Sequence, residues 1–466
     1  MKRFILISIV LIMLISNFGV ADSKEGSLLM VGGALRADND DVYKEFIKLA
    51  GGKENAKIGI VPVASGSPYK YTKLFKKDMV SRGLDKSQVE LIPIAIKDDS
   101  RSEEIDESKW SENGLDKKLA KKVKKYTGIW FVGGDQRRIT KTLFTDDNDK
   151  TPVLESIWEV YNNGGVIGGT SAGAAIMSEI MISGGDSFGA LNIGHTDDFD
   201  ESTLDYQNQG GLVIDKGLGF FKQGIIDQHF GRKGRLGRLI VTGYEHKDKY
   251  PINFGIEENT ALVYKKDKNT LSVKGQKGIV IVDLRESIKK DNSYQKVKVG
   301  YLEGKDKFDL NSKTYIIDES KYTTTGYEYF NRKDPLVSGS VDADNSIKTT
   351  IAYNLVDNKE ADEVSTYLFD KKGKGYQFKF YKINDTEGYW GQSWATDLYS
   401  FKNVGLDIYP VEVNISQLTE KSYTVKEGDV LWKIAEKFDT TVNKIAKNNS
   451  IDNINNIKVG EKLIIR

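Results

Sequence analysis

The first part of the chain, from about residue 27 to 283, alternates between short apolar runs and amphipathic stretches. The apolar runs are rich in β-branched residues and stop at small residues, a pattern that predicts buried strands. They cover 27–33, 56–65, 89–94 and 128–134. Helical spacing separates them over 40–50 and 115–126. This alternation predicts an α/β fold with a doubly wound parallel sheet over 27–285, whose site lies beyond the carboxyl ends of the strands.

The pattern changes over residues 286–418. Helical periodicity fades there, and apolar and polar residues alternate in segments such as 348–356 and 376–383. Alternation at a period of two predicts strands, so we expect a β-rich extension. No motif in this extension indicates a function, and we favour a role as a packing or spacer domain over a role in ligand binding.

The last 45 residues, 422–466, read as a separate small unit. Strands are predicted at 423–425 and 462–465. Between them, Leu431, Ile434 and Phe438 define one apolar helix face, and a second short helix follows. The order strand, helix, helix, strand predicts a compact βααβ domain.

This unit resembles the LysM domain. The motifs are Tyr423-x-Val425, Gly428-Asp429-x-Leu431-Trp432-x-Ile434-Ala435, Asn448-Asn449 and Val459-Gly460-x-x-Leu463. The resemblance implies binding of N-acetylglucosamine-containing glycans, chiefly peptidoglycan. Its implied contacts are the loop residues around Gly428, Asp429 and Asn449.

The N-terminus carries the pattern of an export signal. Lys2 and Arg3 precede an apolar run over 5–15, and small residues end the segment at Gly19-Val20-Ala21. The run is shorter than the roughly 20 apolar residues that span a bilayer. We therefore expect a signal peptide over 1–21 and no membrane span after its cleavage.

Composition narrows the chemistry. Among 466 residues there are 68 basic and 67 acidic side chains, no Cys and three His. A near-neutral chain lacks the basic excess of a nucleic-acid binder. The absence of Cys removes disulfides, thiolate nucleophiles and Cys-based metal sites. No H-E-x-x-H motif is present, and we expect neither a metal nor a cofactor.

A candidate nucleophile lies in the segment 164–180, GGVIGGTSAGAAIMSEI. Val166 and Ile167 end a predicted strand, and helix-favouring residues begin at Ala172. Between them, Gly169-Thr170-Ser171-Ala172-Gly173 matches the G-x-S-x-G nucleophile elbow, in which small residues permit a sharp strand-to-helix turn. The sequence therefore favours Ser171 as a nucleophile.

Only three histidines are available as its general base. His246 lies in a charged segment and reads as a surface residue. His195 follows a glycine-rich stretch and stays a candidate, whereas His229 directly follows the strand-like GIIDQ, a position that favours it. The acid that orients the imidazole is then Glu258, with Glu257 as its immediate competitor.

The motifs GGDQ (133–136), GGTSAGA, DQHF and GIEENTALV together resemble the cyanophycinase family of serine peptidases. That family has a class I glutamine-amidotransferase-like, flavodoxin-like fold. The resemblance implies Ser171 as nucleophile, His229 as base, Glu258 as orienting acid, and backbone amides near Gly134 and Ala172 as the oxyanion hole. It further implies a substrate pocket lined by Gln136, Asp227, Gln228, Arg235 and Arg238.

The basic residues after His229 agree with an anionic or zwitterionic substrate. Arg235 and Arg238 are three residues apart at a predicted helix start, so they share a face suited to carboxylates, while Asp227 suits a substrate arginine. Lys233 is also expected in the substrate site, but the family usually has arginine there. Lysine keeps the charge and loses the planar fork, which leaves the substrate open.

Together these features predict a secreted, cell-wall-associated serine hydrolase. Its expected substrate is cyanophycin, multi-L-arginyl-poly-L-aspartate, cut to β-aspartyl-arginine through an acyl-enzyme. The alternatives are a peptidase for other aspartyl, isoaspartyl or cell-wall peptides, and a catalytically silent wall-binding protein. The sequence leaves the oligomeric state open, a homodimer included.

Overall fold

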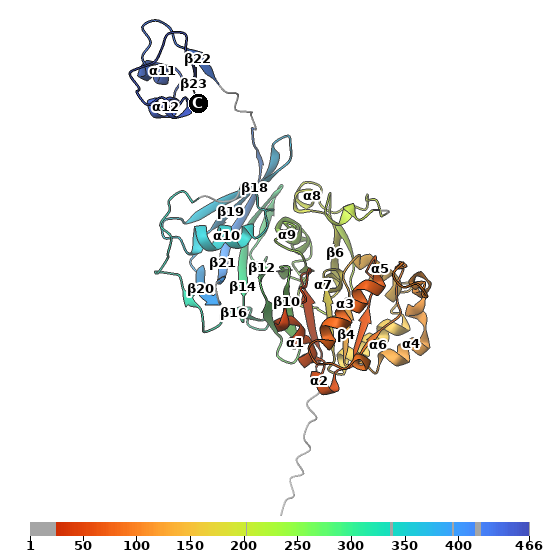
Figure 1. Cartoon of the computed structure of the whole chain (residues 1–466). Coiled ribbons are helices and arrows are strands. Elements are labelled where there is room, and N and C mark those ends of the chain that lie inside the picture. Colours follow the sequence, from red (N-terminus) through yellow and green to blue (C-terminus); the bar gives the residue numbers. More distant parts are fainter. Residues whose placement is uncertain (1–24, 202, 336–338, 394–395, 415–420, 466) are drawn as a thin grey trace, which may run out of the picture. The chain divides into compact units, whose positions relative to one another are not determined.

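The computed structural model describes residues 25–465, apart from 202, 336–338, 394–395 and 415–420 (Figure 1). The predicted signal peptide at 1–21 lies outside the described residues. The chain forms two compact units, Met1–Asp370 with Lys374–Glu412, and Lys371–Gly373 with Val413–Arg466. Within the described ranges, no helix combines the length and apolar character needed to cross a bilayer.

A nine-stranded mixed sheet organises the first part of unit one. Its order is β16 (Thr314–Ile316), β15 (Lys307–Asp309), β11 (Thr270–Gly275), β10 (Thr260–Lys265), β1 (Ser27–Val31), β5 (Val166–Thr170), β4 (Gly128–Phe131), β2 (Ile58–Val61) and β3 (Val89–Leu91). The strands from β1 to β3 in this order are parallel, whereas β10, β11, β15 and β16 extend the sheet antiparallel. The predicted α/β class is confirmed, but the sheet is mixed rather than wholly parallel.

Helices cover both faces of the parallel strands because alternate strand residues point to opposite sides. Leu29 and Val31 pack in a core with α1 (Asp40–Leu49) and α3 (Pro68–Val80). Leu28 and Met30 pack in the opposite core, which contains residues of four other helices. These are α4 (Lys117–Val123), α5 (Gln136–Leu143), α6 (Pro152–Asn162) and α7 (Ala172–Ala175).

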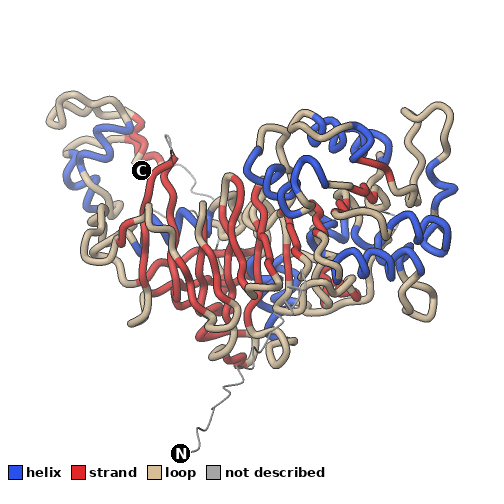
Figure 2. Tube along the Cα trace, turned by 90° about the horizontal axis from the view of Figure 1, so that it is seen from below, coloured by secondary structure: helices blue, strands red, loops and turns tan. Residues whose placement is uncertain are grey.

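A second sheet runs from residues 226–283 into the β-rich extension, and its strands lie side by side as a broad layer (Figure 2). Its main order is β17 (Tyr322–Thr323), β20 (Glu387–Ser393), β21 (Thr396–Glu412), β14 (Ser293–Glu303), β12 (Gly278–Asp283), β9 (Ile252–Ile256) and β8 (Ile226–Asp227). Three further strands join it: β13 (Ile288–Lys290) on β14, and β18 (Glu363–Phe369) beside β19 (Lys374–Tyr381) on β21.

The β-rich extension shares one hydrophobic core with the segment that precedes it. Leu239 and Ile240 of α9 (Leu236–Glu245) belong to the same buried cluster as Phe378 and Phe401. Near this core, β6 (Ile180–Gly184) pairs with β7 (Val213–Lys216), and α8 (Ser187–Asn192) lies between the two strands in the sequence. The expected boundary at 285/286 therefore falls inside a continuous sheet.

One predicted strand is wrong. Residues 348–356 form the end of α10 (Ser346–Ile351) and a π-helical turn, Ala352–Val356. Ile347, Ile351 and Leu355 recur every four residues and are buried, so packing on one helix face overrides the β-branched composition. The other alternating segment, 376–383, lies largely in β19 as predicted.

Unit two contains the expected strand, helix, helix, strand order. β22 (Ser422–Thr424) pairs with β23 (Lys462–Ile464), and α11 (Leu431–Lys437) and α12 (Val442–Asn448) lie between them in sequence. Seven buried apolar residues form its own small core, among them Leu431, Ile434 and Ile445.

Candidate active site

Ser171 occupies the sharp turn between β5 and α7. Its backbone has φ 54° and ψ −111°, outside the regions favoured by residues with a Cβ atom. A Cβ at Gly169 would lie 2.5 Å from the carbonyl oxygen of Gly173, and a Cβ at Gly173 would lie 2.5 Å from that of Phe131. The glycines of G-x-S-x-G therefore let the turn pack tightly while Ser171 stays partly exposed.

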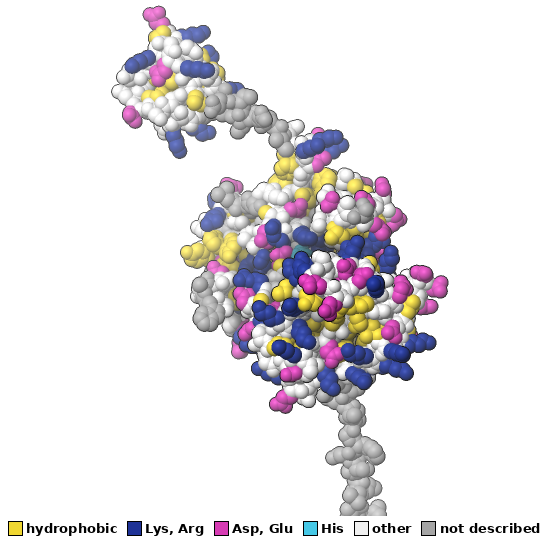
Figure 3. Space-filling model, turned by 45° about the vertical axis from the view of Figure 1, so that its right-hand side comes forward, with side chains coloured by type: hydrophobic (Ala, Val, Ile, Leu, Met, Phe, Trp, Pro, Cys, Tyr) yellow, Lys and Arg dark blue, Asp and Glu magenta, His cyan; other side chains and the backbone are white. Residues whose placement is uncertain are grey.

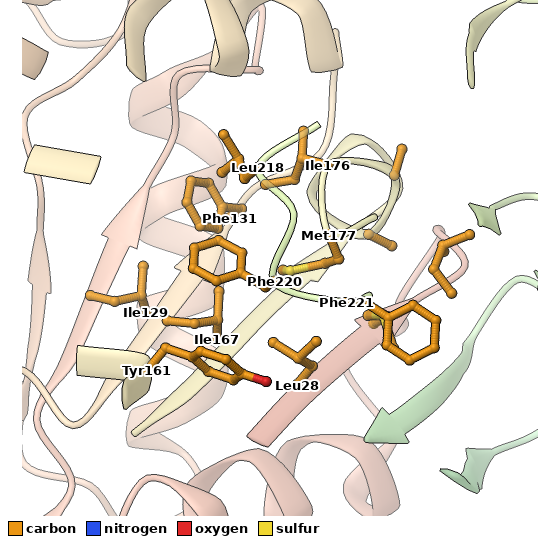
Figure 4. Close-up of a cluster of buried hydrophobic side chains, with 14 of the residues drawn as sticks. Leu28, Ile129, Phe131, Tyr161, Ile167, Ile176, Met177, Leu218, Phe220 and Phe221 are labelled. Carbon is orange, nitrogen blue, oxygen red and sulfur yellow. The ribbon is translucent and has the colours of Figure 1, made fainter. Parts of the chain in front are cut away.

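The turn is anchored by the core beneath it. Ile176 and Met177, which follow α7, belong to the same buried cluster as Phe131 and Phe220 (Figure 4). Because these side chains are fully or almost fully buried, the segment after Ser171 has little freedom to move.

His229 reaches Ser171 from the second sheet. It follows β8 with φ 48°, and its amide donates a hydrogen bond of 2.6 Å to the carbonyl oxygen of Gly32. A Cβ at Gly33 would lie 2.2 Å from Cε1 of His229, so glycine makes room for the ring. His229 Nε2 lies 2.9 Å from Ser171 Oγ.

A carboxylate lies at the other ring nitrogen. Glu258, two residues after β9, places Oε1 at 2.5 Å from His229 Nδ1. Its competitor Glu257 is buried elsewhere, where Oε2 accepts a hydrogen bond of 3.1 Å from the amide of Gly231. Burial raises the pKa of Glu257 to about 7, against a lowering by the charge of Lys277.

The surroundings favour the neutral form of His229. Burial lowers its pKa to about 4, although the hydrogen bond to Glu258 works in the opposite direction. The positive charges of Arg235 and Lys233 contribute to the lowering. A neutral ring can accept a proton from a serine hydroxyl at neutral pH.

The other two histidines lie away from this contact. His195 is exposed, with Nε2 at 3.8 Å from Asp197 Oδ1, and His246 is the C-terminal cap of α9. In the part of the chain that the structure describes, no group of three or more His, Asp or Glu is arranged to hold a metal ion.

The residues of the two amides expected to face an oxyanion follow the ends of neighbouring strands, and Gly134 lines the same cavity as Ser171. Ala172 is the residue after Ser171 and begins α7. Gly134 follows β4, the neighbour of β5, and takes φ 146°, where a Cβ would lie 2.1 Å from the carbonyl oxygen of Ala64. Neither amide donates a backbone hydrogen bond to another described residue.

Asp227, Arg235 and Arg238 form a buried charge cluster. Arg238 donates to both carboxylate oxygens of Asp227, at 2.7 Å from Nε and 2.6 Å from an Nη. Arg235 donates at 2.6 Å to the carbonyl oxygen of Gln228 and lies 3.5 Å from Asp227. Burial by itself would raise the pKa of Asp227, but the charges of the two guanidinium groups outweigh it and lower that pKa. These side chains therefore bind one another, and none is free on a solvated helix face.

The remaining predicted pocket residues differ in how they present their polar groups. Gln136 is buried and donates its amide to the carbonyl oxygens of Ile182 and Ser183. Gln228 is buried with Oε1 at 3.4 Å from Ser171 Oγ. Lys233 is exposed and donates to Asn208 Oδ1 at 2.8 Å.

Two features near these groups were not predicted. Asn208 Oδ1 accepts from both Lys233 and Arg235, and no motif marked it. A cavity of about 640 Å³ also adjoins Ser171. Its apolar wall includes Leu35, Tyr71, Leu74, Phe75 and Trp130. Most of these side chains belong to α3 or to β4, where the sequence pattern gives apolar residues no feature that distinguishes a cavity wall from the hydrophobic core.

In unit two, the predicted glycan residues also have structural contacts. Asp429 accepts from the Tyr423 hydroxyl at 2.8 Å and from the Lys426 amide at 2.7 Å. Asn449 accepts from the amide of Ile464 and donates to its carbonyl oxygen, tying α12 to β23. Gly428 takes φ 85° and leaves open space around it.

The arrangement in unit one defines a class of protein. A serine on a strand-to-helix turn, a histidine at its hydroxyl and a carboxylate at the far ring nitrogen are the groups of a serine-type hydrolase. The sequence profile of peptidase family S51 matches residues 28–272, and the chain belongs to that family. It is a serine-type peptidase, and its C-terminal residues 423–466 match the LysM domain.

Curated relatives agree with the resemblance seen in the motifs. A cyanophycinase from Synechococcus elongatus is 31% identical over 264 residues, which are 56% of this chain and 69% of the relative. Cyanophycinases from a Nostoc species and from Geminocystis herdmanii are 29% and 30% identical, over 74% and 80% of their lengths. These matches cover 56% and 55% of this chain. The resemblance to the cyanophycinase family and to LysM is confirmed.

Proposed function

We propose that the chain is an exported serine peptidase that cleaves cyanophycin to β-aspartyl-arginine and is held at the cell wall by its LysM domain. The observation that carries the catalytic part is the chain of contacts from Ser171 through His229 to Glu258. Similarity to three cyanophycinases supports the substrate, and the pattern of residues 1–21 supports export.

The three side chains suit an acyl-enzyme mechanism. Glu258 accepts a hydrogen bond from His229 Nδ1, which leaves Nε2 unprotonated toward Ser171. As Ser171 Oγ attacks a carbonyl carbon of the polyaspartate backbone, its proton passes to Nε2 over 2.9 Å. His229 returns that proton to the departing amine, and water then hydrolyses the ester by the reverse sequence.

Backbone amides are proposed to stabilise the tetrahedral intermediate. The amides of Gly134 and Ala172 are free of backbone acceptors among the described residues, so they can donate to a developing oxyanion. α7 has only four residues, so its dipole contributes little, and the individual amides are the main donors.

The buried charge cluster separates the residues predicted to line the substrate pocket into two groups: those that hold the structure and those that are available to the substrate. Asp227 and Arg238 are each 1% exposed and pair with one another, so we assign them to positioning of the loop that carries His229. Lys233 is exposed and adjoins this cluster. Each arginyl residue of cyanophycin has a free α-carboxylate, which Lys233 is placed to attract.

The test is release of β-aspartyl-arginine from purified cyanophycin by residues 22–466, beside a Ser171→Ala variant. Turnover that disappears in the variant supports both substrate and nucleophile. A folded, phosphonate-reactive chain that releases no dipeptide contradicts the substrate but not the mechanism.

Lys233 favours a second candidate function. A lysine at the position where the family usually has arginine loses bidentate recognition, so the site could serve other aspartyl, isoaspartyl or cell-wall peptides. Turnover of soluble isoaspartyl dipeptides without turnover of cyanophycin would support this candidate. An unreactive Ser171 in a folded chain would instead support a silent wall-binding protein.

Wall attachment is tested separately. Exposed apolar side chains of the LysM unit, such as Trp432 (57% exposed) and Val459 (67% exposed), are available to a sugar face. Residues 22–466 should sediment with insoluble peptidoglycan, and residues 22–414 should stay in the supernatant. Equal sedimentation of both would contradict attachment through LysM.

A further inference from the structure

The β-rich part of unit one contains a cavity of about 860 Å³ that the proposed reaction does not use. Seven of the eleven described residues that line it are aromatic. They come from β17, the loop after it, the π-helical turn, β20 and β21. We call it the aromatic pocket and define it by Tyr322, Tyr329, Tyr353, Asp357, Trp390 and Asp397.

The outer wall of the aromatic pocket is unusually exposed. Tyr322 is 71% exposed and Tyr329 is 84% exposed. Its inner wall is firmly packed, since Tyr353 and Tyr399 meet edge to face with ring centroids 4.9 Å apart. Exposed aromatic rings above a packed aromatic floor are typical of a ligand site rather than of a surface that only needs to be soluble.

Two carboxylates give the aromatic pocket a negative charge. Asp357 is 3% exposed and accepts from the Tyr399 hydroxyl at 2.6 Å and the Tyr329 amide at 2.8 Å. Asp397 accepts from Trp390 Nε1 at 3.2 Å. Neither carboxylate forms an ion pair with a described Lys or Arg. Asp397 is exposed, but Asp357 is buried, and buried carboxylates are normally paired, so the pocket favours a cationic ligand.

Lys348, which contacts the backbone of Asp397, does not supply a counter-charge to the pocket carboxylates. The ammonium of Lys348 pairs with Glu303, although it also donates to the backbone oxygen of Asp397. Burial raises the pKa of Tyr353, and the charges of Asp397, Glu303 and Asp357 raise it further, which reflects a negative field inside the pocket. On the face of the molecule shown in Figure 3, by contrast, basic and acidic side chains are interspersed.

The aromatic rings favour a flat cation. A guanidinium is planar and weakly hydrated, stacks on aromatic faces and donates to carboxylates. The edge of the cavity already provides an example within the chain, because the guanidinium carbon of Arg332 lies 4.7 Å from the ring centroid of Phe330. A neutral sugar could stack there too, but it would leave both carboxylates without a counter-charge.

We propose that the aromatic pocket binds the guanidinium group of an arginyl side chain, with the rings stacking on its face and Asp357 and Asp397 balancing its charge. The source of that side chain rests on the proposed function: cyanophycin carries an arginine on every aspartate. The pocket then holds the polymer while another stretch of it is cleaved.

Binding is tested first with small ligands and with the Ser171→Ala chain of residues 22–466, so that nothing is turned over. L-arginine amide and L-citrulline amide have the same shape, but only the first has a charged guanidinium. Calorimetric titration should show at least about tenfold tighter binding of arginine amide. Equal affinity for the two ligands would overturn the proposal.

Variants assign that binding to the aromatic pocket. Asp397→Asn keeps an acceptor for Trp390 and should weaken arginine amide binding by about three- to tenfold. Tyr353→Leu should weaken it as well. The matched control is Glu54→Gln, which removes an exposed carboxylate in the four-residue helix Gly52–Asn55 and should change nothing. Unchanged affinity in both folded pocket variants would overturn the proposal, as would pocket-dependent binding of N-acetylglucosamine oligomers.

The polymer is tested last, with Ser171 intact. Asp397→Asn should raise KM for cyanophycin several-fold and leave kcat unchanged, because the pocket does not touch the reacting bond. If the chain does not cleave cyanophycin at all, the proposed function fails, while the amide titrations still decide whether the pocket binds guanidinium.

Discussion

His229 Nδ1 lies 2.5 Å from Glu258 Oε1, and the two residues leave adjacent parallel strands of the second sheet, β8 and β9. Ser171 leaves β5 of the first sheet. The candidate site is therefore assembled where two sheets meet, and Gly32 and Gly33 at the end of β1 connect them through the contacts with His229. Both sheets must be formed before the three side chains can meet.

Glu258→Gln is expected to reduce kcat by about 10³- to 10⁴-fold, because an amide favours the wrong imidazole tautomer. Its matched control is Glu257→Gln, one residue away, which keeps an acceptor for the Gly231 amide and should retain most of kcat. Steady-state kinetics on cyanophycin or an isoaspartyl peptide measure both. Greater loss in Glu257→Gln would reverse the assignment.

The acid limb of the pH profile of kcat/KM should lie well below pH 6.5, which is about the ordinary pKa of a histidine side chain. Burial lowers the pKa of His229 to about 4, so the ring stays neutral and able to accept a proton as the pH falls from 7 to 6. The pH profile of kcat/KM checks this. An acid limb centred at or above pH 6.5, in a chain whose folding does not change over that pH range, would contradict the lowered pKa of His229.

Affinity for an arginyl substrate should decline above about pH 8. Although the side chain of Lys233 is exposed, partial desolvation of its ammonium group and the positive charges of Arg235 and Arg238 lower the pKa of Lys233 to about 8. Above that pH its neutral amine no longer attracts a carboxylate. In Lys233→Arg the charge persists to higher pH, so the rise in KM should disappear. The comparison is KM at pH 7 and pH 9 for both chains, and an identical rise in each would refute the role of Lys233.

Asp227→Asn should lower the free energy of unfolding by about 3–5 kcal/mol, because it leaves two buried guanidinium groups without a counter-charge. The control is Glu159→Gln, which breaks a pair with Lys124 in which both side chains are about half exposed. That substitution should lower the free energy of unfolding by less than about 1 kcal/mol. Urea denaturation measures both variants, and similar values would show that the buried cluster is not a stabilising unit.

The parts of this molecule that follow local rules could be predicted from its sequence. Ser171 was marked by small residues at fixed spacing, and His229 and Glu258 by their positions after apolar runs. The second sheet was not foreseen, because strand pairing between β9, β12 and β14 depends on contacts that no local pattern encodes. Arg238 was expected to line the substrate pocket, and its burial in a pair with Asp227 could not be predicted, because that pair depends on contacts across the fold.

The β-rich extension shows the same limit. Alternation predicted strands at 348–356, yet the segment is helical because its apolar residues also repeat every four positions and pack on one core. The aromatic pocket could not be seen either, since Tyr322, Asp357 and Asp397 are far apart in the sequence and converge only through the sheet.

The most direct test of the catalytic account is covalent labelling of the folded chain with a serine-directed phosphonate, followed by peptide mass spectrometry. We expect one adduct, on Ser171, formed more slowly by at least about 10²-fold when His229 is replaced by alanine. An adduct on another serine, or none on a folded chain, would contradict the assignment of Ser171 as the activated nucleophile.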